Sequence, residues 1–132
     1  MKLAHHTTTC ALGYIDKEKR LLPMFDCIWM TSCLDGEMTA GLFMPEEHRA
    51  RIVIESFGKE LYKIDDIQEE FPHLNFHLLN QISDTSKWYV SFEPIDESEF
   101  VSVSTMSNGQ WVERGNLETI ASEKQTEECH IQ

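Results

Sequence analysis

Two histidines four residues apart, His73 and His77, are the side chains best placed to do chemistry in this sequence. On a strand they would share one polar face, and Glu93 on the next strand could stand beside them. Imidazole and carboxylate groups bind divalent metals, but the spacing specifies no third ligand, and no glutamate lies between the histidines as in common zinc motifs. His73 and His77 are therefore weak metal candidates. A small hydrolase or metal-dependent protein using His73, His77 and Glu93 remains an alternative to two exposed strand histidines.

A second pair, His6 and Cys10, invites comparison with an imidazole–thiolate nucleophile. Four residues of extended strand would hold the two side chains about 13 Å apart, too far for a hydrogen bond. Asp66 and Glu70 would share one face of a helix, where a solvated surface explains them as well as a carboxylate pair does. The six glycines are isolated and form no phosphate-binding loop. The sequence thus predicts no catalytic residue and no cofactor.

The net charge of −12 is the strongest compositional feature, and more than half of the acidic excess lies within residues 93–128. A field of this sign repels nucleic-acid phosphates and anionic membranes and speeds encounters with basic proteins. We therefore expect a basic protein partner, with no direct binding to nucleic acid and none to a membrane.

These observations favour a small acidic protein-binding module that acts as a stoichiometric inhibitor or neutraliser of a basic partner. Immunity proteins and phage anti-defence proteins provide the analogy, and in one version of this hypothesis the acids mimic DNA. The predicted partner-binding residues are acids and one aromatic from the C-terminal third of the chain: Glu93, Asp96, Glu97, Glu99, Trp111, Glu113 and Glu118. Another alternative is a homo-oligomeric protein for ligand binding or assembly, such as a homodimer joined through the Met-rich segment 24–44.

Length and composition predict one domain spanning residues 1–132, with about six residues frayed at each end. The sequence contains no apolar run of signal-peptide or membrane-span length, so we expect a cytoplasmic protein. The four cysteines, Cys10, Cys27, Cys33 and Cys129, lack metal-binding spacing and are expected to be free thiols. A disulfide between Cys27 and Cys33 is an open alternative.

The elements expected to position these residues give an α+β fold: an antiparallel sheet of about five to seven strands built from hairpins, with two or three helices packed on it. Strands are predicted over 7–15, 20–31, 37–44, 74–78, 88–92, 100–105 and 110–113, with tight turns at Asp35-Gly36 and Asn108-Gly109. A helix is predicted over 45–57 because Ala50, Val53, Ile54 and Phe57 form one apolar stripe. Further helices are predicted over 65–71 and 116–124, and Trp29, Trp88 and Trp111 are assigned to the core or its edge.

Overall fold

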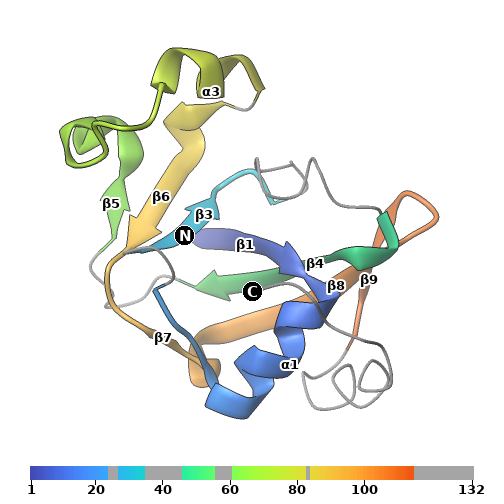
Figure 1. Cartoon of the computed structure of the whole chain (residues 1–132). Coiled ribbons are helices and arrows are strands. Elements are labelled where there is room, and N and C mark those ends of the chain that lie inside the picture. Colours follow the sequence, from blue (N-terminus) through green and yellow to red (C-terminus); the bar gives the residue numbers. More distant parts are fainter. Residues whose placement is uncertain (24–26, 35–45, 56–60, 83, 115–132) are drawn as a thin grey trace.

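A seven-stranded antiparallel sheet organises the chain (Figure 1). The computed structural model describes residues 1–23, 27–34, 46–55, 61–82 and 84–114. The strands follow the order β5-β6-β3-β1-β4-β8-β9, and every neighbouring pair is antiparallel. Their bounds are β1 Lys2–Thr8, β3 Ile28–Thr31, β4 Arg49–Glu55, β5 Tyr62–Lys63, β6 Trp88–Ser91, β8 Phe100–Ser107 and β9 Gln110–Glu113. A second sheet pairs β2 (Arg20–Leu21) with β7 (Ile95–Asp96). The prediction of an α+β fold with an antiparallel sheet is confirmed.

The helices differ from the prediction in number and place. Within the described residues, α1 (Thr9–Glu18) and the short α3 (Phe76–Ile82) are the α-helices. Single 3₁₀ turns occur at η1 (Glu46–His48), η2 (Ile64–Asp66), η3 (Gln68–Glu70), η4 (Thr85–Lys87) and η5 (Glu97–Glu99). The segment predicted as a helix over 65–71 is thus divided between η2 and η3, and the helix predicted over 116–124 lies outside the described residues. Among the described residues, no helix is long and apolar enough to cross a membrane.

The helix predicted over 45–57 is wrong, because this segment forms η1 and then the central strand β4. Ala50, Ile52 and Ile54 are buried on one face of β4, and Val53 is buried on the other. A strand covered on both faces reads as a continuous apolar run, and its β-branched residues suit a sheet. The helical stripe misled because Ala50 and Ile54 share a face at both helical and strand spacing.

The expectation of a frayed N-terminus is also wrong. Residues 2–8 form β1, which pairs with β4 along its whole length, and the terminal amine of Met1 lies 2.8 Å from a carboxylate oxygen of Glu55. The strand predicted over 7–15 instead becomes helix α1 from Thr9 onward. The Thr8 side chain caps this helix by accepting a hydrogen bond from the Ala11 amide at 3.1 Å. The C-terminal residues expected to fray lie outside the described residues.

Of the other predicted strands and turns, some are confirmed, some are wrong and some lie outside the described residues. Segment 20–31 forms two strands, β2 and β3, rather than one. The strand predicted over 74–78 is wrong, because its residues from Phe76 onward belong to α3, and the side chain of Asn75, directly before this helix, accepts a hydrogen bond from the Leu78 amide. The predicted strands over 88–92, 100–105 and 110–113 are confirmed as β6, β8 and β9. The Asn108-Gly109 turn is confirmed by positive φ values of 52° and 76°. The Asp35-Gly36 turn and the strand over 37–44 lie outside the described residues.

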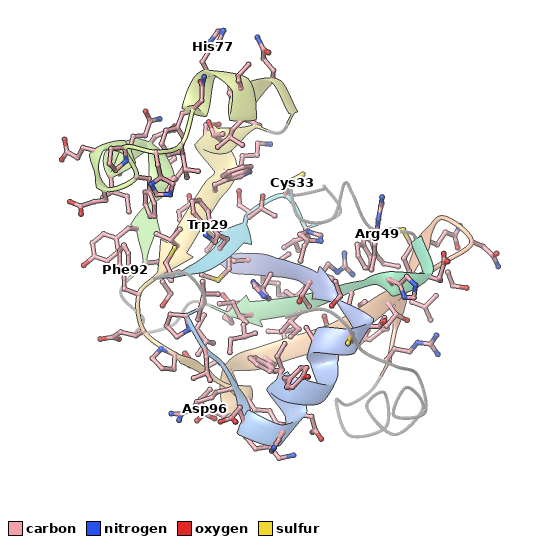
Figure 2. All side chains as sticks on the ribbon, viewed as in Figure 1. Trp29, Cys33, Arg49, His77, Phe92 and Asp96 are labelled. Atoms are coloured by element: carbon pink, nitrogen blue, oxygen red, sulfur yellow. The ribbon has the colours of Figure 1, made fainter. Side chains whose placement is uncertain are left out.

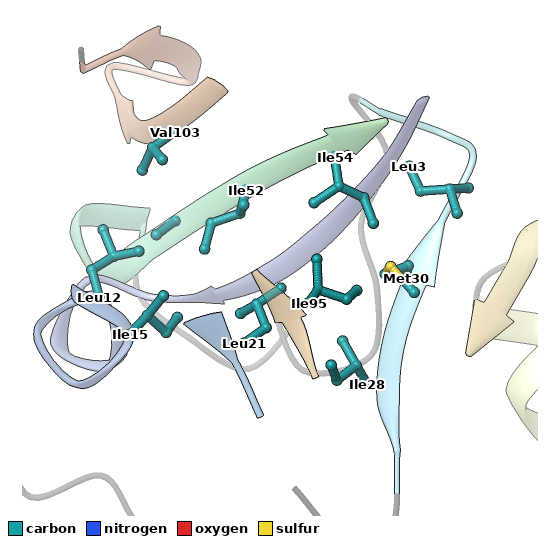
Figure 3. Close-up of a cluster of buried hydrophobic side chains, with 11 residues drawn as sticks. Leu3, Leu12, Ile15, Leu21, Ile28, Met30, Ile52, Ile54, Ile95 and Val103 are labelled. Carbon is teal, nitrogen blue, oxygen red and sulfur yellow. The ribbon is translucent and has the colours of Figure 1, made fainter. Parts of the chain in front are cut away.

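Two hydrophobic clusters occupy opposite faces of the sheet. The first cluster joins the sheet to α1 and the small sheet, with Leu12, Leu21, Ile52, Ile54 and Ile95 among its members (Figure 3). The second cluster lies under residues 61–82 at the β3–β6 end and contains Cys27, Ile64, Phe71, Trp88 and Val90. Strand β3 contributes to both clusters, because Ile28 and Met30 face the first and Trp29 faces the second.

The cysteines follow the free-thiol expectation only in part. Cys27 is buried and Cys33 is exposed, and no disulfide joins them. Cys10 is disulfide-bonded, which corrects the expectation for that residue. Sequence spacing missed this bond because disulfide pairing follows tertiary contacts.

Candidate functional site

The acids Glu93, Asp96, Glu97 and Glu99 lie along one segment that runs from the end of β6 through β7 into η5. The Asp96 carboxylate accepts from the Ser98 amide at 3.1 Å, and the Glu99 carboxylate accepts from the Asp96 amide at 3.2 Å. This capping box fixes the η5 turn. The segment is also tied to the end of α1, because the Glu97 amide donates to the Lys19 carbonyl at 3.0 Å. Asp96 and Glu99 therefore hold the backbone, and Glu93 and Glu97 have no part in that cap.

The structure does not place Trp111 and Glu113 beside that segment. Both belong to β9, an edge strand, and Glu113 is paired with Ser104 of β8. Ser104 lies four residues beyond Phe100, where β8 begins after η5, so about 13 Å of extended chain separates the two groups. The predicted partner-binding residues thus fall into two groups, and Glu118 lies outside the described residues.

The histidines proposed for metal binding do not meet Glu93. His73 precedes α3 and His77 lies on it, both exposed, while Glu93 follows the far end of β6 (Figure 2). His77 Nε2 lies 3.4 Å from the Gln81 side-chain nitrogen. Across the part of the chain that the structure describes, no group of three or more His, Cys, Asp or Glu residues could hold a metal ion. The described geometry therefore gives the metal-dependent alternative no support.

Cys10 is likewise unable to act as the nucleophile considered for the His6–Cys10 pair, because a disulfide sulfur carries no thiolate. The Met-rich segment considered for oligomer contacts lies largely outside the described residues. Within its described part, Met30 is fully buried in the first core cluster.

A polar row that the sequence did not reveal crosses the sheet on the face opposite α1. Backbone pairing aligns His6 of β1 with Arg51 of β4, Arg51 with Ser104 of β8, and Ser104 with Glu113 of β9. The Arg51 guanidinium donates to the Leu34 carbonyl at 2.9 Å and to the Ser104 hydroxyl at 3.3 Å. His6 and Ser104 are buried. The helix prediction over 45–57 hid this row, because only a strand register places Arg51 between His6 and Ser104.

Trp111 lies over this polar row. Its ring centroid is 4.8 Å from the Arg51 guanidinium carbon and 5.6 Å from the centroid of the His6 ring. A guanidinium at this distance from an indole face is attracted by the ring quadrupole. Trp111 therefore has a structural role, holding β9 against β4 and β1, which is consistent with its predicted place at the edge of the core.

We expect Arg51 and Trp111 to be energetically coupled. In a double-mutant cycle with Arg51→Met and Trp111→Leu, the coupling free energy should be about 1 kcal/mol, since the pair is partly shielded from water. Urea unfolding of the wild-type protein, both single variants and the double variant measures it. If the losses of unfolding free energy in the two single variants add up to the loss in the double variant within about 0.3 kcal/mol, the contact between Arg51 and the Trp111 ring contributes nothing to stability.

Another histidine missed by the sequence analysis, His5, lies on the opposite face of β1. Its Nδ1 is 2.8 Å from the carbonyl oxygen of Trp29. Burial lowers the pKa of His5 below its usual value of 6.5, and the hydrogen bond to Trp29 offsets this only in part. The His5 imidazole is therefore neutral at pH 7, with Nδ1 donating to the carbonyl.

Comparisons with family models, with curated proteins and with solved structures find no match for this chain. The functional argument therefore depends on the residues and geometry described above.

Proposed function

We propose that the chain is a protein-binding module that acts as a stoichiometric inhibitor or neutraliser of a basic partner protein. The net charge of −12 supports a partner of opposite sign. Carboxylates gather on two segments of the described surface. The first is η2–η3, where Asp65, Asp66, Glu69 and Glu70 are all exposed, and the second is the segment from Glu93 to Glu99.

The observation that carries the proposal is that the acids from Glu93 to Glu99 lie on a backbone segment held in place by hydrogen bonds. The backbone beneath them is fixed by the capping box and by the bond to Lys19, so little ordering is required when a partner binds. Glu93 and Asp96 are exposed, so their negative charges can act on a partner at long range and raise its association rate.

An exposed aromatic residue distinguishes the Glu93–Glu99 segment from η2–η3. Phe92, directly before Glu93, is 41% exposed, and its ring centroid lies 5.5 Å from that of Tyr62 on the edge strand β5. Protein interfaces favour aromatic anchors beside charged groups. We therefore assign direct partner contact to residues Phe92–Glu99. The acids of η2–η3 are assigned only a contribution to the negative electrostatic potential that attracts a basic partner.

Affinity capture with three matched baits tests this function. The baits are the wild-type chain, the double variant Glu93→Lys/Glu97→Lys, and the control Asp66→Lys/Glu69→Lys, which changes the net charge equally. Glu93 and Glu97 are chosen because reversing Asp96 or Glu99 would break the capping box. We expect wild type and control to retain one basic protein from the native lysate in stoichiometric amount at low salt, and the Glu93/Glu97 variant to lose it.

The captured protein must also lose its own activity when one equivalent of the chain is added. A partner retained equally by all three baits, or one that stays fully active in the complex, would contradict the proposal. Retention of no basic protein would contradict it as well.

A further inference from the structure

Among the described residues, the boundary between β1 and β3, here called the β1–β3 seam, has fewer backbone register pairs than any other boundary between neighbouring strands of the seven-stranded sheet. On its other side, β1 pairs with β4 from Lys2–Glu55 through Thr8–Arg49. With β3 it shares one register pair among the described residues, Ala4–Thr31. The seam therefore divides the sheet into a β3–β6–β5 block and a β1–β4–β8–β9 block (Figure 1).

The imidazole of His5 spans this seam. Its Nδ1 donates to the carbonyl oxygen of Trp29 at 2.8 Å, and a carbonyl can only accept, so Nδ1 carries the proton. A side chain thus makes a hydrogen bond across the junction where the backbone ladder is short. His5 is half-buried, whereas Leu3 and Ala4 on the same strand are fully buried.

The described surroundings of His5 offer no charge to stabilise an imidazolium. On the same sheet face lie Leu3 and Thr7 of β1, Ile52 and Ile54 of β4, and Met30 of β3, and Leu12 of α1 packs into the same core. The titratable groups farther along this face are Tyr89 of β6, which pairs with Met30, and Lys63 of β5, which pairs with Tyr89. Tyrosine is neutral below about pH 10, and a lysine cation disfavours a second positive charge.

We propose that His5 makes the β1–β3 seam sensitive to pH: the neutral ring fits the apolar face at this junction. A protonated ring keeps its Nδ1 hydrogen bond to Trp29, but it places a positive charge among apolar side chains with no described counter-charge, and so favours an open seam. Because burial lowers the His5 pKa in the closed seam, an open seam binds more protons below pH 6.5. The closed seam is therefore most stable above that pH and weakens as the pH falls below it. This behaviour is independent of any partner protein.

Hydrogen exchange detected by mass spectrometry tests the proposal at about pH 7.5 and about pH 5.5, after division by intrinsic exchange rates. In the wild-type chain, protection of residues 2–8 and 27–31 should fall at least about threefold at the lower pH, while β8 and β9 stay protected. His5→Asn keeps a donor near the Nδ1 position but does not titrate, so its seam protection should be the same at both pH values. His77→Gln, which removes an exposed histidine, should behave as wild type.

A pH-independent seam in the wild type, or an equal loss of protection in His5→Asn, would overturn the proposal. A loss spread evenly over β8 and β9 would also overturn it, because it would report global unfolding. Should His5→Asn fold poorly, NMR titration of wild-type histidine rings decides the matter. The amide shifts of Ala4 and Thr31 must then follow the titration of His5 and no other ring.

Discussion

Ile52→Ala should lower the free energy of unfolding by about 3 kcal/mol, measured by urea denaturation followed by circular dichroism. Ile52 is fully buried in β4, between His5 of β1 and Val103 of β8. Removing its side chain leaves a cavity in a strand that has neighbours on both sides and cannot readily collapse. The cost therefore includes both lost apolar burial and the cavity itself.

The same variant distinguishes the strand from the helix that the sequence favoured. In a helix over 45–57 with its stripe at Ala50, Val53 and Ile54, position 52 would point away from the core, and alanine would be neutral or stabilising. Val112→Ala is the matched control, because Val112 is 39% exposed on the edge strand β9 and should cost less than about 0.5 kcal/mol. An Ile52→Ala cost as small as that of the control would contradict the β4 assignment.

Trp88→Ala should lower the free energy of unfolding by about 4 kcal/mol. Trp88 is 3% exposed in the second core cluster, and its ring meets Trp29 edge-on at 5.8 Å with an interplanar angle of 84°. The change removes a large apolar surface and this aromatic contact. Urea unfolding measures the effect.

Leu78→Ala provides the control for Trp88→Ala, because Leu78 on α3 is 54% exposed and should cost less than about 0.5 kcal/mol. A cost for Trp88→Ala below about 1 kcal/mol would show that residues 61–82 do not form a packed layer over β3 and β6.

The strands at the C-terminal end were predictable because their signals are local. Alternation in β8 and β9 and the positive φ values needed at Asn108-Gly109 are properties of neighbouring residues. Strand β4 was not predictable in this way. Its apolar run Ile52-Val53-Ile54 is buried on both faces, so strand and helix periods fit it equally, and only its partners β1 and β8 decide between them.

In the candidate site too, features visible in the local sequence were predicted and features that depend on strand pairing were not. The acids from Glu93 to Glu99 were found because net charge and clustering are visible in the sequence, but the capping role of Asp96 and Glu99 was not. Arg51 and His5 were missed because their partners are set by strand register. The Arg51 row depends on pairing with β1 and β8, and the bond from His5 depends on a backbone carbonyl of β3.

The most direct test of the proposed function is the association rate of the captured partner with the two charge-reversal variants as salt is varied. At low salt, Glu93→Lys/Glu97→Lys should slow association by about tenfold, and Asp66→Lys/Glu69→Lys by less than about threefold. The difference should shrink as salt screens the charges. Equal slowing by both variants would show that only net charge matters and would contradict a binding surface at Phe92–Glu99, and unchanged rates for both would contradict the acidic binding module itself.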